Sequence, residues 1–294
     1  MKPGKFEYYR ASNLQEAVQF MGEHGEECKI IAGGQSLVPL LNMRIAEPRC
    51  LLDISSLSEL DYITEKDGII RIGALTKQRT LETSEIIHKR APVLLEAVKN
   101  IGHPQTRSRG TVGGSLAHAE PSAEIALAML ALDAEVTIAG SSGFRKVPIG
   151  EFLVSEFTTA LSENEILTEV SFDSTSIHSG YAFEEFSFRR GDFAIASAIS
   201  LVTTGSGGVI ERARVTIGGI DSRPVIIEEA EDILKGSKFS NSLIIEICSI
   251  IEKIANVGDD MHSSSEYKLN LAKVMFEKSF KRAYEMAIAL EVRH

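Results

Sequence analysis

Short apolar runs alternate with amphipathic stretches over the first 56 residues. Runs of strand character occur at three places: 6–10, 29–31 and 50–54. Apolar positions at helical spacing predict helices over 13–22 and from 37 to 44. The pattern indicates a small α/β lobe, with a polar, glycine-rich turn between its second strand and second helix.

The same signals continue through the next 120 residues in a longer series. Strands are predicted at four places: around Tyr62, 69–72, 135–139 and 166–172. Helices are predicted over 83–100, with an interruption near Pro92, and over 121–132. The serine-rich stretch 173–180 is the predicted domain boundary.

The remainder of the chain separates its strands from its helices. Three strand-like segments come first, over 181–189, 195–204 and 209–217, and three helical segments follow, over 226–234, 243–255 and 267–290. Strands followed by helices are typical of an α+β domain built on an antiparallel sheet.

Two glycine pairs in polar turns carry the clearest chemical signal. Gly33-Gly34-Gln35-Ser36 stands between a strand and a helix, and Gly113-Gly114-Ser115 follows about 80 residues later. Glycine lets successive N–H groups face one anion without a Cβ in the way. Either pair alone is more simply a surface turn, but two of them suggest a pyrophosphate held from two sides. The motifs GxGxxG and GxxxxGK[ST] are missing, so a dinucleotide would bind in a fold other than Rossmann.

Composition narrows the function class. The 294 residues are 44% hydrophobic and 24% charged, as in a soluble protein with a core, and the net charge of −10 argues against nucleic acid as a partner. No run is long enough to span a bilayer and the start lacks the apolar core of a signal peptide, so a cytoplasmic location is expected. Cys28, Cys50 and Cys248 are too scattered for an iron–sulfur cluster or structural zinc in this chain alone.

Longer motifs around both glycine pairs resemble a known family. They are Ala32-Gly33-Gly34-Gln35-Ser36-Leu37, Asp53-Ile54, the stretch IGHPQTRSRGTVGGSLA over 101–117, Pro121-Ser122-Ala123-Glu124 and Phe188-Arg189-Arg190-Gly191-Asp192-Phe193-Ala194-Ile195. Together they resemble the FAD-binding medium subunit of molybdenum hydroxylases, the family of carbon monoxide dehydrogenase medium subunits and the xanthine dehydrogenase flavin domain. The resemblance covers essentially the whole chain.

The resemblance implies an α+β protein, with a two-lobed FAD-binding domain of the vanillyl-alcohol oxidase type and an α+β C-terminal domain. It places the lobes at 1–56 and 57–175 and the C-terminal flavoprotein domain at 176–294, with FAD between the lobes. The implied FAD contacts are Ala32, Gly33, Gly34, Gln35, Ser36, Leu37, Ile101, Thr111, Gly113, Gly114, Ser115, Glu124 and Phe193.

Several of these residues have a structural alternative. An acidic residue such as Glu124 in a first helical turn is favourable without any ligand, whereas relatives usually carry Asp there, toward the ribityl hydroxyls. Phe193 is either core or an aromatic shield for the flavin ring. His103 and His118 are expected to be loop residues beside the flavin. Gln35 stands where some relatives carry His, and because an amide cannot form a histidyl–flavin bond, noncovalent FAD is expected.

The sequence then predicts an electron-transfer subunit without a catalytic residue or metal of its own. By resemblance, a large subunit bears molybdopterin and a small subunit bears 2Fe–2S clusters, in a dimer of heterotrimers. Electrons would leave the FAD for NAD, a quinone or O₂. Two alternatives stay open: a self-contained flavin oxidoreductase of the same fold, and an assembly scaffold that has lost FAD.

Overall fold

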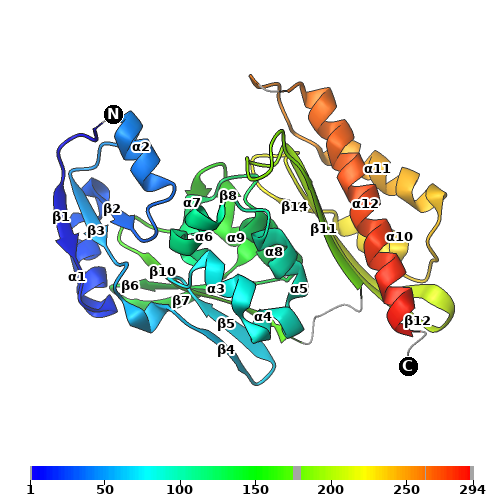
Figure 1. Ribbon diagram of the computed structural model, residues 1–294, viewed down its shortest axis with the longest axis horizontal. Coiled ribbons are helices and arrows are strands. Elements are labelled where there is room, and N and C mark those ends of the chain that lie inside the picture. Colours follow the sequence, from blue (N-terminus) through cyan, green and yellow to red (C-terminus); the bar gives the residue numbers. More distant parts are fainter. Residues whose placement is uncertain (1, 175–179, 262, 292–294) are drawn as a thin grey trace.

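Three sheets follow one another along the molecule (Figure 1). The computed structural model describes residues 2–174, 180–261 and 263–291. The first sheet belongs to the N-terminal lobe, the second to a central lobe, and the third to the C-terminal domain. Residues 175–179, the centre of the predicted boundary at 173–180, lie outside the described residues.

The N-terminal lobe is a three-stranded parallel sheet. Its strands β1 (Glu7–Arg10), β2 (Cys28–Ile31) and β3 (Cys50–Asp53) stand in the order β1-β3-β2. Parallel strands need crossovers, here supplied by α1 (Leu14–His24) with a short 3₁₀ turn (Gly25–Glu27), and by α2 (Leu37–Met43). Asn13 caps α1 by accepting a hydrogen bond from the Glu16 N–H at 2.9 Å.

The central lobe contains a five-stranded antiparallel sheet. Its order is β4-β5-β10-β6-β7, from strands β4 (Ile63–Lys66), β5 (Ile69–Gly73), β6 (Glu135–Gly140), β7 (Gly143–Pro148) and β10 (Ile166–Asp173). Buried side chains alternate along β5, where Ile70 and Ile72 face the core. A second, small ribbon pairs β8 (Leu153–Ser155) with β9 (Thr158–Thr159).

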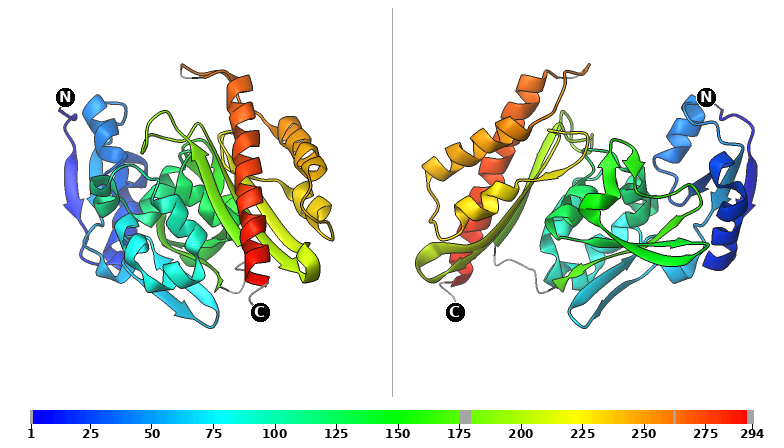
Figure 2. Two further views of the ribbon diagram at one scale, coloured as in Figure 1. Left: turned by 45° about the vertical axis from the view of Figure 1, so that its right-hand side comes forward. Right: turned by 180° about the vertical axis from the view of Figure 1, so that it is seen from behind.

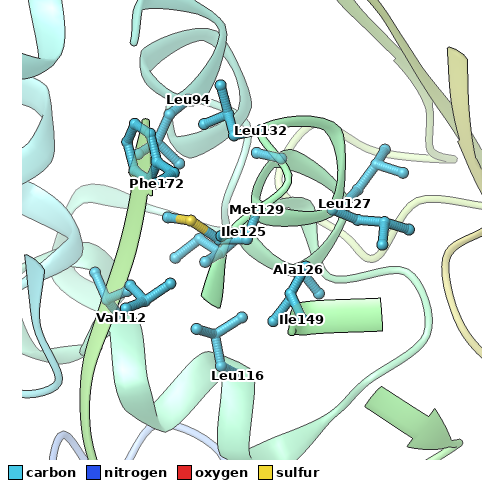
Figure 3. Close-up of a cluster of buried hydrophobic side chains, with 14 of the residues drawn as sticks. Leu94, Val112, Leu116, Ile125, Ala126, Leu127, Met129, Leu132, Ile149 and Phe172 are labelled. Atoms are coloured by element: carbon cyan, nitrogen blue, oxygen red, sulfur yellow. The ribbon is translucent and has the colours of Figure 1, made fainter. Parts of the chain in front are cut away.

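Short helices fill the space between this sheet and the C-terminal domain (Figure 2). They are α3 (Gln78–Thr83), α4 (Glu85–Arg90), α5 (Pro92–Val98), α6 (Pro104–Arg109), α7 (Val112–His118), α8 (Glu124–Ala131) and α9 (Ile149–Phe152). A 3₁₀ turn over Ser58–Leu60 belongs elsewhere, because its Leu60 packs in the core of the N-terminal lobe. Every residue of α8 is buried, and Figure 3 shows Ile125 and Met129 among side chains such as Leu116 and Phe172. A helix that is apolar on all sides belongs in a core, and α8 is the centre of this one.

The C-terminal domain is an antiparallel sheet covered on both faces. It has β11 (Gly180–Phe186), β12 (Ala196–Gly205), β13 (Val209–Gly218) and β14 (Val225–Ile226) in that order, with a 3₁₀ turn (Ser206–Gly208) before β13. The long helix α12 (Ser265–Glu291), with α10 (Glu228–Leu234) and α11 (Asn241–Ile254), covers one face (Figure 1). The other face packs on α5 and α8 of the central lobe, so Phe183, Ile199 and Leu201 join the central core.

The sequence-based boundaries need several corrections. The predicted interruption near Pro92 is confirmed: α4 and α5 are divided at Ala91, because Pro92 has no N–H to continue the first helix. The two helices span Glu85–Arg90 and Pro92–Val98 rather than the whole of 83–100. Helix α8 begins at Glu124 rather than at 121, and the strand expected over 181–189 ends at Phe186. Strand β7 and helices α3 and α6 were not predicted at all, because each is a short segment with mixed polar and apolar residues.

Candidate functional site

The first glycine turn lies at the carboxyl edge of the parallel sheet. Residues 32–36 connect β2 to α2, and Gly34 adopts a φ of +70°, which glycine tolerates best. At Gly33 an added Cβ would stand 2.2 Å from the backbone oxygen of Arg109. Glycine is therefore needed at 33 because the two lobes meet backbone against backbone.

Backbone N–H groups without a hydrogen-bond partner in the described structure distinguish this turn. Within the described residues, the backbone N–H groups of Gly33, Gly34, Gln35 and Ser36 make no protein hydrogen bond. The carbonyls of Gly34 and Ser36 accept the first bonds of α2, from the N–H groups at 38 and 40 at 3.1 and 3.3 Å. The Ser36 hydroxyl makes no capping bond. Four clustered, unsatisfied donors in a half-exposed turn suit an anionic ligand.

The second glycine pair is not a loop, as the sequence suggested. Gly113 and Gly114 lie in the first turn of α7, and the Thr111 hydroxyl caps that helix by accepting from Gly114 N–H at 3.1 Å. The Gly113 N–H donates to the Ala74 carbonyl at 2.8 Å, and Ser115 N–H donates to the Thr111 carbonyl. These N–H groups already have protein partners, and contact of this pair with FAD stays a prediction. Gly113 permits α7 to pack closely on Ala74, because a Cβ added at residue 113 would stand 2.5 Å from the Ala74 Cβ.

The segment 101–110 joins the N-terminal lobe to the C-terminal domain. The end of the segment at Arg109 and Gly110 meets Gly33 of the N-terminal lobe. At the other end, a Cβ on Gly191 would stand 2.8 Å from the Gly102 carbonyl. Arg107, 7% exposed, fixes this segment by donating to the carbonyls of Ile101 at 2.7 Å and Gly102 at 3.3 Å. Ile101 is partly buried against the central core.

Three carboxyl groups meet where α8 begins. Glu124 is 7% exposed, and its burial, reinforced by the charges of Glu185 and Glu120, raises its pKa to about 8. Burial raises the pKa of Glu185 to about 7, and its Oε2 is buried without a hydrogen-bond partner in the described structure. Burial also raises the pKa of Glu120 to about 6, although Ser122 donates to it from N–H and Oγ at 2.8 and 3.1 Å. These groups hold protons at pH values where exposed carboxyls do not.

Phe193 is not a core residue. It is 66% exposed on the connection between β11 and β12, with Phe188 on the same connection 57% exposed. Phe186, at the end of β11, meets Phe188 edge to face with ring centroids 6.4 Å apart. The structural alternative considered for Phe193 is therefore wrong, and its role toward a flavin stays a prediction.

The two histidines differ from the expectation that both are loop residues. His103 is exposed immediately before α6, whereas His118 is the last residue of α7. The His118 ring lies 5.1 Å from that of Phe157, and burial lowers its pKa.

Charged residues near Gly33 were missed by the sequence analysis. Lys77 precedes α3 and its backbone pairs with Thr111 in an isolated bridge, while Arg109 ends α6. Within the described residues neither side chain forms an ion pair or a hydrogen bond. No local sequence signal marks Lys77, because only the tertiary fold brings it to this crossing.

The 32–36 turn and Glu124 have the chemistry that FAD requires. The turn 32–36 offers free N–H donors and a close backbone approach, as a pyrophosphate requires. Glu124 is a buried carboxyl that hydrogen-bonds to its own backbone N–H and to no side chain of the described residues, which suits a hydroxyl-rich ligand. The described residues contain no group of three or more potential metal ligands. None of the helices in the described ranges has the length and apolar character needed to cross a bilayer.

Comparison with known proteins identifies both halves of the chain. Residues 4–172 match the FAD binding domain in molybdopterin dehydrogenase, and residues 181–283 match the CO dehydrogenase flavoprotein C-terminal domain. The 6-hydroxypseudooxynicotine dehydrogenase complex subunit alpha of Paenarthrobacter nicotinovorans is 41% identical over 98% of this chain and 97% of its own length. The carbon monoxide dehydrogenase medium chain of Hydrogenophaga pseudoflava is 31% identical over 97% and 99%.

Solved structures match this chain over almost its whole length. Quinoline 2-oxidoreductase from Pseudomonas putida 86 superposes with a TM-score of 0.93 at 32% identity, covering 98% of this chain and 100% of that one. The carbon monoxide dehydrogenase from Hydrogenophaga pseudoflava that lacks the Mo-pyranopterin moiety gives 0.94 at 31% identity, covering 97% and 99%. The chain therefore belongs to the family of FAD-binding subunits of molybdenum hydroxylases, and is an FAD-dependent oxidoreductase subunit of the carbon monoxide dehydrogenase medium-chain type.

Proposed function

We propose that this chain is the electron-transfer subunit of a molybdenum hydroxylase. It would hold FAD noncovalently between its first two lobes, whose limits we place at 1–56 and 57–175, with the C-terminal domain at 176–294. One observation carries the proposal: the backbone N–H groups over 33–36 have no hydrogen-bond partner in the described structure, and Gly33 lies directly beside the Arg109 backbone of the opposite lobe. Bound FAD would supply the redox chemistry, taking electrons singly and delivering them in pairs.

The chain's own residues would bind, orient and shield the cofactor. The 32–36 turn would donate to the phosphates, and Glu124, protonated or hydrogen-bonded, would face the polyol part. Phe193 is exposed on a connection whose Gly191 touches Gly102, which suits an aromatic cover over the ring system. Thr111 and Gly113 would act indirectly by fixing α7, rather than as donors.

Partner subunits complete the proposed electron path. Relatives are named as medium chains or as subunits of complexes, which supports a large and a small partner subunit. We propose that the large subunit bears molybdopterin and the small one 2Fe–2S clusters, in a dimer of heterotrimers. Electrons would pass from the 2Fe–2S clusters to this chain and on to NAD, a quinone or O₂. His118 packs against Phe157 and His103 is exposed, and neither ring hydrogen-bonds to a polar group among residues 2–174, 180–261 and 263–291. This favours the carrier over a self-contained oxidoreductase.

Visible absorption of the purified chain, before and after acid precipitation, tests the cofactor. Yellow colour that moves into the supernatant supports noncovalent FAD, as the Gln35 amide leads us to expect. Flavin that stays in the pellet contradicts the noncovalent mode, and a colourless chain that takes up no added FAD contradicts the proposal. Flavin reduction by substrate only in the presence of the partner subunits supports the carrier role; turnover by the isolated chain contradicts it.

A further inference from the structure

Two cations, Lys77 and Arg109, lie where the N-terminal and central lobes cross, and in the described part of the chain neither side chain forms an ion pair or hydrogen bond. Residues 76–78 run beside 110–112: Val112 N–H donates to the Thr76 carbonyl at 3.0 Å, and Gln78 N–H donates to the Gly110 carbonyl at 2.9 Å. Gly33 touches the same Arg109–Gly110 backbone from the other lobe. Lys77 and Arg109 are therefore anchored next to the turn that carries the free N–H groups.

Charged groups of both lobes act on the Lys77 ammonium. Its ammonium interacts electrostatically with Asp61, Arg109 and Asp53. Asp53 ends β3 directly beside Ile31, the residue before the turn. The carboxyl edge of the N-terminal sheet therefore lies within electrostatic range of the Lys77 ammonium.

Asp53 does not serve as the counterion of Lys77. Its carboxylate accepts hydrogen bonds from the Tyr8 hydroxyl and from Ser55 N–H, and it lies 3.8 Å from the Arg10 Nε. Lys77 is half-buried, and burial followed by the Arg109 charge lowers its pKa, against the opposing effect of Asp61. Among the described residues, no carboxylate lies within 4.0 Å of the Lys77 ammonium, and Asp61 and Asp53 act on it only from a longer distance. A half-buried ammonium without a direct ion pair is unfavourable until an anion arrives.

Gln78 adds an independent observation at the same crossing. Its side chain is only 6% exposed, yet its Oε1 has no hydrogen-bond partner within the described structure. It packs directly on Gly110, where an added Cβ would stand 2.6 Å from Oε1. A buried, unpaired amide beside two unpaired cations and a row of free N–H groups indicates a polar ligand at this point.

We infer that Lys77, assisted by Arg109, neutralises the pyrophosphate of the FAD held by the 32–36 turn. This inference rests on the proposed FAD site between the lobes. Two positive charges match the two negative charges of a pyrophosphate diester, and the N–H groups supply the direction that point charges lack. Lys77 thereby acts as a cofactor-binding residue and not as a catalytic one.

The test is a titration of the full-length chain, freed of flavin, with FAD at 50 and 500 mM NaCl. Flavin fluorescence gives the Kd for wild type, Lys77→Met, Lys77→Arg and Lys66→Met. Lys66 is an exposed lysine at the end of β4 and controls for the change in net charge. We expect Lys77→Met to raise the Kd about 10- to 100-fold at low salt, as for a lost charge-assisted hydrogen bond, and to flatten the salt dependence. Lys77→Arg should stay within a few-fold of wild type, and Lys66→Met should match it.

The thermal midpoint of the flavin-free protein separates binding from a structural role. Because Lys77 forms no ion pair or side-chain hydrogen bond within the described residues, flavin-free Lys77→Met should melt no lower than wild type. A lower midpoint, or a Lys77→Arg variant as weak as Lys77→Met, assigns Lys77 a packing role and overturns the inference. An unchanged Kd and salt dependence in Lys77→Met overturns the inference while leaving the proposed function intact. A wild-type chain that binds no FAD overturns both.

Discussion

Two glycines show how surroundings decide the effect of one methyl group. A Cβ at Gly33 would stand 2.2 Å from the Arg109 carbonyl, whereas a Cβ at Gly22, inside α1, meets nothing within 4 Å. We expect Gly33→Ala to separate the lobes and weaken FAD binding at least ~10-fold, since overpacking of this kind costs about 1–3 kcal/mol. Gly22→Ala should stabilise the chain by roughly 0.5–1 kcal/mol. Flavin content after gel filtration and urea unfolding measure the two effects. Full flavin retention by Gly33→Ala would show that the close approach is not required.

Glu124 makes the flavin-free protein sensitive to pH. Its folded-state pKa is about 8 because of burial, above that of an exposed glutamate, so the protonated form is favoured in the fold. Its contribution to stability is therefore fully present below about pH 4.5 and is lost as the pH rises through about 8.

Glu124→Gln removes that titration while keeping a neutral side chain of the same size. The flavin-free variant should lose less stability than wild type between pH 5.5 and 8.5, by roughly 2–4 kcal/mol at ~1.4 kcal/mol per pKa unit. Urea unfolding at the two pH values measures this, with Glu246→Gln on the exposed face of α11 as the control. Equal pH dependence in wild type and Glu124→Gln would contradict the assignment of the raised pKa to Glu124.

At the scale of the element, Arg107 holds α6 and the segment before it in place. Its Nε donates to Glu82 Oε1 at 2.5 Å with both side chains about nine-tenths buried, while Arg79 contacts the other oxygen of Glu82 at 2.7 Å from an exposed position. We expect Arg107→Met to cost about 3–5 kcal/mol, because it leaves the buried Oε1 of Glu82 and two carbonyls without the Arg107 donor. The exposed Arg79 still contacts the other carboxylate oxygen. Arg79→Met should cost about 0–1 kcal/mol.

Hydrogen exchange locates the effect of Arg107→Met. Amide protection should fall over 101–110, where the Ile101 and Gly102 carbonyls lose their donor. Equal losses of stability in the Arg107 and Arg79 variants would mean that burial does not separate the two ion pairs.

The elements predicted correctly from the sequence are those fixed by local pattern. Strand β2 and helix α1 depend on their own apolar spacing, and the break before Pro92 depends on one missing N–H. Helix α7 was misread because Gly113 and Gly114 normally interrupt helices; it forms because Thr111 caps it and Ala74, from a distant strand end, accepts the Gly113 N–H. The backbone pairing of Lys77 with Thr111 also depends on a contact between distant segments, and no local sequence pattern indicates it. Contacts between distant segments, rather than local propensity, decide these parts of the site.

For the whole molecule, the C-terminal sheet connects its own domain to the central lobe. Its strand β12 is buried on both faces, with Ile199 and Leu201 in the central core and Ala198 and Val202 in the core beneath α12. Polar contacts join the same parts: Arg282 of α12 pairs with Glu96 of α5 and with Glu184 of β11. The two domains thus share a buried interface and are not independent units joined only by a linker.

A chain ending at residue 174 should therefore not behave as a free FAD-binding domain. Removing the C-terminal sheet exposes the apolar sides of α5 and α8, including Leu127, and leaves Glu96 without its arginine. Exposed apolar patches of this kind promote association, so we expect the truncated chain to bind a hydrophobic dye, elute as aggregates and retain little FAD. Gel filtration with detection of flavin absorbance compares it with the full chain. Leu127→Ser in the full chain provides an intermediate case, because it weakens the same interface while the covering domain remains. A monomeric truncated chain with the full-length affinity for FAD would show that the shared core is dispensable, and that the 32–36 turn and the residues of the central lobe form the site alone.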